Sequence, residues 1–171
     1  MARAPDADPF GDLAEAIGML VISFNELEIA LGGALMHILG QDEKTGAVFA
    51  SHLSASAKLK LLDALKFKIP DGRYKDEFTE QLQRATEINS ERNRFIHSAY
   101  WSHEEGVEEP IVLHRKLRDA HQPTTYPITI GQLSKHIKTV SPTDIGDLAN
   151  DATSLASDIL HVAEKLRPEK P

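Results

Sequence analysis

Two long stretches of the chain carry apolar side chains at alternating steps of four and three residues, and this spacing constrains the fold more than any other feature. The series in residues 12–39 is Ile17, Val21, Phe24, Glu28, Leu31, Leu35 and Ile38, in which Glu28 is the one polar member. The series in residues 143–167 is Leu148, Ala152, Leu155, Ile159, Val162 and Leu166. Residues three and four apart share one face of an α-helix, so each series predicts a long helix with a buried seam.

Start and stop signals divide the rest of the chain. Gly40 stops the first helix, Ser54 caps another that ends before Pro70-Asp71-Gly72, and Ser141-Pro142 starts the last one. The expected helices cover residues 12–39, 42–50, 54–69, 73–97, 131–139 and 143–167. The pattern predicts an all-α fold in the main, an up-down helical bundle.

A small β insertion is expected after the fourth helix, at about residues 99–130. Residues 99–103 and 111–118 alternate as strands do, and the turn-rich residues 104–110 join them into a hairpin. A third extended piece is expected at residues 126–130. We therefore predict a flexible tail over residues 1–11 and a single domain over residues 12–167.

Composition limits the classes of function. With 171 residues, of which 41% are hydrophobic, the chain is long enough for one globular core. It has no cysteine, which excludes disulfides and zinc–cysteine sites, and neither a signal peptide nor an apolar run near the length of a membrane span is evident. A cytoplasmic protein without membrane contact is predicted. The net charge of −7 excludes a general nucleic-acid coat, since polyanion binding depends on basic residues.

One short segment near the end of the fourth predicted helix suggests chemistry. It reads Arg92-Asn93-Arg94-Phe95-Ile96-His97 and supplies a phosphate-binding cation, an orienting amide and a proton carrier. At about 100° per residue, Arg92 falls inside the apolar arc, Asn93 and His97 lie together on its edge, and Arg94 points to solvent.

The position of Arg92 also has a purely structural interpretation. A buried arginine needs a counter-charge, and Glu28 in the first seam needs one as well. We therefore expect an ion pair between Glu28 and Arg92 that clamps two helices together. On this interpretation His97 only interacts with the C-terminal dipole of its helix.

The same segment resembles the R-x4-6-H signature of HEPN domains, including the polar residue directly after the arginine. The long first helix with an acidic residue, the motif late in a later helix and the closing helix extend the resemblance over most of the chain. It implies a HEPN-like bundle that pairs as a two-fold homodimer, and in active members a metal-independent endoribonuclease with no cofactor. It also implies an RNA substrate and, in some members, an antitoxin or other protein partner in toxin-antitoxin or defence systems; non-catalytic members are dimeric RNA- or protein-binding scaffolds.

Carried onto this chain, the resemblance implies catalytic roles for three residues. His97 would be the general acid or base for attack of an RNA 2′-hydroxyl on the neighbouring phosphate, Arg92 would hold that phosphate, and Asn93 would orient either group. The products would carry 2′,3′-cyclic phosphate and 5′-hydroxyl ends. Because Arg92 and His97 are about 140° apart on a helix, a cleft shared by two protomers is expected. Toxin members that pair with a nucleotidyltransferase antitoxin carry a tyrosine two residues after the histidine, where this chain has Ala99 followed by Tyr100, so that subfamily is disfavoured.

Other polar residues have weaker signals. RNA-guiding roles are assigned to Arg94, Tyr100, His114, Arg115, Lys116 and Arg118, with an alternating solvated strand face as the alternative for the last four. A metal site built on His97, His103, Glu104 and Glu105 lacks the spacing of a zinc helix, so no metal is expected. The pair Gly32-Gly33 is expected to allow close approach of a second helix, such as that of a dimer mate.

Overall fold

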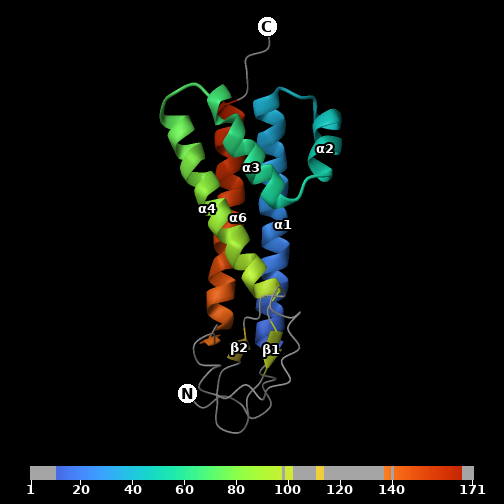
Figure 1. Ribbon diagram of the computed structural model, residues 1–171, viewed down its shortest axis with the longest axis vertical. Helices are drawn as coiled ribbons and strands as arrows, with labels where there is room; N and C mark the ends of the chain where they lie inside the picture. The colour runs from blue at the N-terminus through green and yellow to red at the C-terminus, as the bar shows by residue number, and fades with distance from the viewer. Residues whose placement is uncertain (1–10, 98, 102–110, 114–136, 140, 167–171) are drawn as a thin grey trace, which may run out of the picture.

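The computed structural model describes residues 11–97, 99–101, 111–113, 137–139 and 141–166, and this part of the chain is mainly helical (Figure 1). The helices are α1 (Gly11–Leu39), α2 (Glu43–Ser51), α3 (Ala55–Leu65), the 3-10 turn η1 (Lys66–Lys68), α4 (Arg73–Ile96) and α6 (Pro142–Lys165). The strands are β1 (Ala99–Trp101), β2 (Ile111–Leu113) and β3 (Ile137–Thr139).

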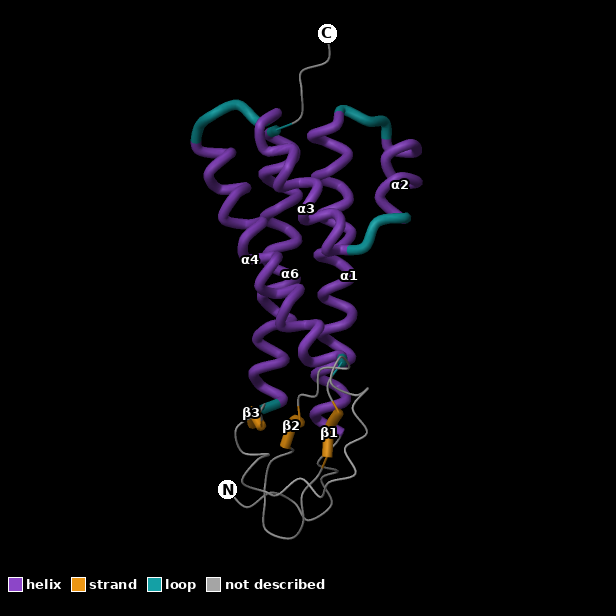
Figure 2. Tube along the Cα trace, in the orientation of Figure 1, coloured by secondary structure: helices purple, strands orange, loops and turns teal. Residues whose placement is uncertain are grey.

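The long helices form one elongated bundle. Figure 2 shows α1 and α6 side by side, both starting at the end of the bundle that carries the strands, while α4 runs back toward that end. The most extensive packing is between α1 and α6, and α4 packs mainly on α6 and α3. The shorter α2 and α3 cover only the far half of α1, so the half near the strands has fewer helical neighbours.

Local signals place the helix ends where the sequence predicts them. The side chain of Ser54 accepts from Ala57 N at 3.3 Å, and Ser141 forms a capping box with Asp144. Gly40 adopts a φ of +64°, the left-handed conformation that ends many helices. The predicted helices over residues 12–39, 42–50, 73–97 and 143–167 are confirmed to within two residues at each end.

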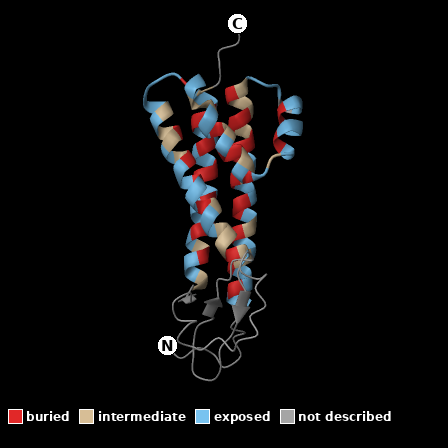
Figure 3. Cartoon of the chain, viewed as in Figure 1, coloured by how far each residue is buried: buried red, intermediate tan, exposed pale blue. Residues whose placement is uncertain are grey.

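The buried face of α1 differs from the predicted single seam. Phe24, Leu31, Leu35 and Ile38 are buried as expected, whereas Ile17 and Val21 are only half-buried. A second row is also buried: Leu13, Ala16, Leu20, Ser23, Leu27, Ala30 and Ala34. The physical reason is that α1 contacts α6 as well as α3 and α4, so it buries two adjacent faces (Figure 3).

The three strands are short and pair antiparallel in the order β1-β2-β3. Tyr100 lies opposite Val112, and Val112 lies opposite Lys138. The connecting residues 102–110 and the expected extended residues 126–130 lie outside the described part, so the hairpin insertion stays a prediction. The helix expected over residues 131–139 is wrong at its end: residues 137–139, of which Ile137 and Thr139 are β-branched, pair with β2 as strand β3.

The helix α1 is also long and apolar enough to cross a membrane, judged by length and composition alone. Its 18-residue apolar window has a mean hydropathy of 1.5, so the prediction that no apolar run nears the length of a membrane span is wrong for this helix. Within that window 56% of the residues are buried inside the bundle, so its apolar side chains also form part of the core. The predicted cytoplasmic location stays a prediction.

Candidate functional site

The predicted motif lies where α4 ends, next to the strands. His97 is the C-cap residue of α4: its backbone N–H donates to the Asn93 carbonyl at 3.2 Å, and its φ of −101° and ψ of 14° end the helix. The His97 side chain is exposed. A proton carrier is therefore open to solvent one helical turn after Asn93.

Arg92 is half-buried and sits on an aromatic ring of α1. Its guanidinium carbon lies 4.9 Å from the centroid of Phe24, close enough for a cation–π contact. One Nη1 N–H donates to the Asn93 amide oxygen at 3.0 Å, while Nε is buried and has no hydrogen-bond partner among the described residues. The structure thus brings Arg92 and Asn93 together and leaves a buried donor unmet.

The expected ion pair between Glu28 and Arg92 is wrong. Glu28 instead accepts from Lys58 of α3, with 3.0 Å between Lys58 Nζ and Glu28 Oε1 and 3.4 Å between Nζ and the Glu28 carbonyl oxygen. The reason is that α3 and α4 contact α1 at different positions along its axis. The end of α4 meets α1 at Phe24, one turn before Glu28, whereas α3 brings Lys58 to Glu28 itself.

Within the described residues, no carboxylate forms an ion pair with Arg92. Its neighbour Arg94 differs, since its guanidinium lies 3.4 Å from Glu91 and 4.8 Å from the ring centroid of Phe95. The expectation that Arg94 points to solvent holds only in part, because 30% of its side chain is exposed. Arg92 is therefore the more available cation of the motif.

The remaining predicted guide residues are only partly covered by the structure. Tyr100 is in β1, opposite Val112, so the backbone carries it close to the end of α4. His114, Arg115, Lys116 and Arg118 lie outside the described residues, and so does His103.

No metal site is found in the part of the chain that the structure describes, where no group of three or more His, Asp or Glu side chains is close enough to hold an ion. The expected absence of a cofactor stays a prediction.

The glycine pair of α1 accommodates neighbours within the same chain. A Cβ placed at Gly32 would lie 3.3 Å from the Ala50 Cβ of α2, and one at Gly33 would lie 3.0 Å from Leu160 Cδ2 of α6. The prediction of close helix approach is confirmed. The idea that the approaching helix comes from a dimer mate is replaced by α2 and α6.

Two residues that the sequence analysis missed complete the arrangement. Phe24 was read only as a core residue, yet it also supports the guanidinium of Arg92. Lys58 escaped notice although it lies between Ala55 and Leu62 on the buried face of α3. A lysine on an apolar helix face was the available signal, because a buried ammonium needs an acidic partner.

The arrangement can bind an anion at Arg92 and move a proton at His97. A half-buried guanidinium that no carboxylate of the described residues balances suits a phosphate oxygen, and an exposed imidazole can exchange protons with a ligand. Comparisons with protein-family models, with curated proteins and with solved structures found no match for this chain.

Proposed function

We propose that the protein is a HEPN-like, metal-independent endoribonuclease that works as a two-fold homodimer. In this proposal the 2′-hydroxyl of RNA gives its proton to His97 and attacks the adjacent phosphorus. The bond to the 5′-oxygen breaks, and that oxygen takes up a proton, leaving 2′,3′-cyclic phosphate and 5′-hydroxyl ends. Arg92 binds the phosphate oxygens while charge develops on them.

The single observation that carries the proposal is the state of Arg92. The structural interpretation needed Glu28 as its counter-charge, and Glu28 is paired with Lys58. Arg92 keeps an amide and a ring as partners, and its buried Nε donates to no acceptor among the described residues. A half-buried cation without an acid is favourable only if something else balances it, and a phosphate supplies both charge and acceptors.

The direction of the two groups supports the proposed homodimer. Arg92 and His97 are about 140° apart on α4, so one protomer does not easily aim both at one atom. Two α4 ends facing each other would place Arg92 of one protomer near His97 of the other. Two histidines would also allow one to take a proton while the other gives one.

The alternative is a non-catalytic scaffold, and a different surface favours it. Met19, Ile22 and Ile29 of α1 are 51%, 57% and 72% exposed, an apolar stripe that contact with a partner would cover. Ile22 is about 160° around α1 from Phe24, which faces Arg92. A dimer built on this stripe would keep the two motifs apart.

A cleavage assay tests the proposal. Purified protein is incubated with chelator and a panel of 5′-labelled single-stranded RNAs, and the products are scored for cyclic-phosphate ends. Cleavage that persists in chelator is expected. If none of the RNAs is cleaved by a correctly folded dimer, the scaffold function replaces the enzyme.

A further inference from the structure

The short helix α2 is attached to the bundle through small residues. Within residues 44–51 of α2, only Gly46 and Ala50 are buried, and because they are four apart they share one face of the helix. The main helical neighbour of α2 is α1. A Cβ placed at Gly32 of α1 would lie 3.3 Å from the Ala50 Cβ, so the two helices approach each other closely at this point.

Met36 of α1 forms the other half of this contact. A Cβ placed at Gly46 would overlap the Cγ and Sδ atoms of Met36 and would lie 3.1 Å from its Cβ. The thioether therefore lies directly against the backbone of Gly46, and no room is left between them for a further atom. Met36 is only half-buried, so part of its side chain is open to small solutes.

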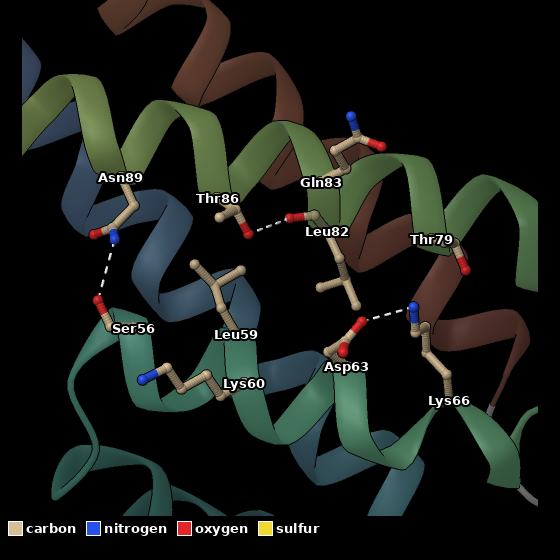
Figure 4. A pocket seen from close by; sticks show the side chains of 10 residues that line it. All are labelled: Ser56, Leu59, Lys60, Asp63, Lys66, Thr79, Leu82, Gln83, Thr86 and Asn89. Carbon is tan, nitrogen blue, oxygen red and sulfur yellow. Dashed lines mark hydrogen bonds and ion pairs between the residues drawn. The ribbon is translucent and has the colours of Figure 1, made fainter.

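Polar contacts do not reinforce the attachment of α2. Within the described residues, no hydrogen bond or ion pair joins α2 to another helix. The neighbouring α3 differs, because Ser56 accepts from Asn89 of α4 at 3.1 Å beside a groove that both helices line (Figure 4). A second polar contact joins α3 to α1, the ion pair of Lys58 with Glu28. The position of α2 thus depends on packing around Met36 and Ala50.

The sulfur of Met36 can also be oxidised. The chain has three methionines and no cysteine, so thioethers are its only sulfur groups. With hydrogen peroxide, a lone pair of Sδ attacks one peroxide oxygen, the O–O bond breaks, and the departing hydroxide takes the remaining proton and leaves as water. The sulfur loses two electrons and becomes a sulfoxide, while the peroxide is reduced. Methionine sulfoxide is polar, and reductases convert it back to the thioether.

We propose that Met36 is a redox-sensitive contact, at which oxidation by hydrogen peroxide releases α2 from α1. The added oxygen has no space against Gly46, and a buried sulfoxide would need a donor. The backbone N–H of Gly46 does not supply one, since it already donates to the Asp42 carbonyl at 2.9 Å. A helix of nine residues has little stability by itself in water, so α2 unwinds once it is detached.

This contact is separate from the proposed cleavage site, and the inference does not rest on that function. Figure 1 shows α2 beside the half of α1 that lies away from the strands, whereas the motif lies next to them. The same helix also offers an internal comparison. Met19 is 51% exposed, so an oxygen added to its sulfur can remain in solvent without displacing a neighbouring helix.

The experiment treats the full chain with hydrogen peroxide and follows two quantities. Peptide mass spectrometry measures the sulfoxide at Met36 and at Met19 separately. Hydrogen–deuterium exchange measures the opening of residues 43–51, with α6 as the reference. The variants are Met36→Leu, which keeps a similar apolar volume without sulfur, and Met36→Gln, which places a polar group there without oxidant. Met19→Leu is the matched control, and circular dichroism verifies that each variant is folded.

We expect oxidation to speed exchange in residues 43–51 by about tenfold or more in wild type and in Met19→Leu, because a buried polar group opposes the closed contact. In Met36→Leu the same treatment should change exchange by less than about twofold, since no sulfur is left at this contact. Met36→Gln should exchange rapidly before oxidant is added, while α6 should change by less than about twofold in every sample.

Three results would overturn the proposal. Met36 could stay reduced under conditions that oxidise Met19 completely. Exchange of residues 43–51 could be unchanged although mass spectrometry finds Met36 fully oxidised. Oxidation could also open α2 in Met36→Leu as much as in wild type, which would place the sensitive group elsewhere.

Discussion

Two cations face α1 from neighbouring helices, and their surroundings differ. Lys58 of α3 is 7% exposed and holds the Glu28 carboxylate at 3.0 Å, so its charge is balanced within the bundle. Arg92 of α4 lies one turn away along α1, over Phe24, with the Asn93 amide as its hydrogen-bond partner. Both side chains are cationic at neutral pH, yet among the described residues only Lys58 has an acid beside it.

This difference distinguishes a charge that stabilises the fold from a charge that can bind a ligand. A buried ion pair whose members satisfy each other ties two helices together and has little left for a ligand. A half-buried guanidinium with an amide partner retains donors and net charge. We therefore assign Lys58 to stability and Arg92 to anion binding, and the following variants test that division.

The largest expected effect is on catalysis at the Arg92 end. His97→Ala should lower RNA cleavage by about 10²–10⁴-fold, the usual contribution of a general acid or base. The fold should be unchanged, because the His97 side chain is exposed. Initial rates on labelled RNA measure the effect, with His161→Ala, an exposed histidine of α6, as the control. Equal rates for wild type and His97→Ala would remove His97 from the site.

The next effect concerns stability at the Lys58 end. Lys58→Ala leaves Glu28 without its partner and should lower the free energy of unfolding by about 1–3 kcal/mol, below the roughly 3–5 kcal/mol of a fully buried pair. The reduction reflects that 30% of the Glu28 side chain is exposed to water. Urea unfolding followed by circular dichroism gives the value, and Lys44→Ala serves as the exposed control. A change no larger than that of the control would mean that the pair contributes nothing.

A double-mutant cycle then separates the two cations directly. Glu28→Gln combined with Lys58→Met should show a coupling of about 1 kcal/mol or more, since the two side chains are in contact. Glu28→Gln combined with Arg92→Met should be additive within about 0.5 kcal/mol, because these residues share no partner. Strong coupling between Glu28 and Arg92 would support the ion pair first expected between them and would contradict a role of Arg92 in binding a ligand.

The smallest expected effect is on association. Ile29→Asp alters the exposed stripe of α1, on the side away from Phe24, and the proposed catalytic dimer does not use that face. Sedimentation velocity at micromolar concentration should give the same dimer for this variant and for wild type. Dissociation by Ile29→Asp, with cleavage absent, would instead support the scaffold.

The sequence alone determined the helices and their ends, because these depend on neighbours within a turn or two. Ser54, Ser141 and Gly40 act through their own side chains or backbone, and the three-four spacing of apolar residues reports which face is buried. The mainly helical class and the place of the motif late in α4 follow from those local rules. The end of the expected helix over residues 131–139 failed because pairing with β2 is a contact between residues far apart in the sequence.

Only the tertiary structure decided which charges meet. The periodicity of α4 predicted Arg92 as the partner of Glu28, whereas the structure pairs Glu28 with Lys58 of α3. Which of the two cations pairs with Glu28 depends on where along the α1 axis α3 and α4 cross it. These crossing points are set by the packing of the whole bundle and not by the residues near either charge. The packing of the bundle also places α2 and α6 of the same chain against Gly32 and Gly33. It leaves a groove between α3 and α4. Contacts between residues far apart in the sequence depend on how all the helices pack. The interior is close-packed, so a side chain cannot reach a different partner unless the surrounding helices also shift.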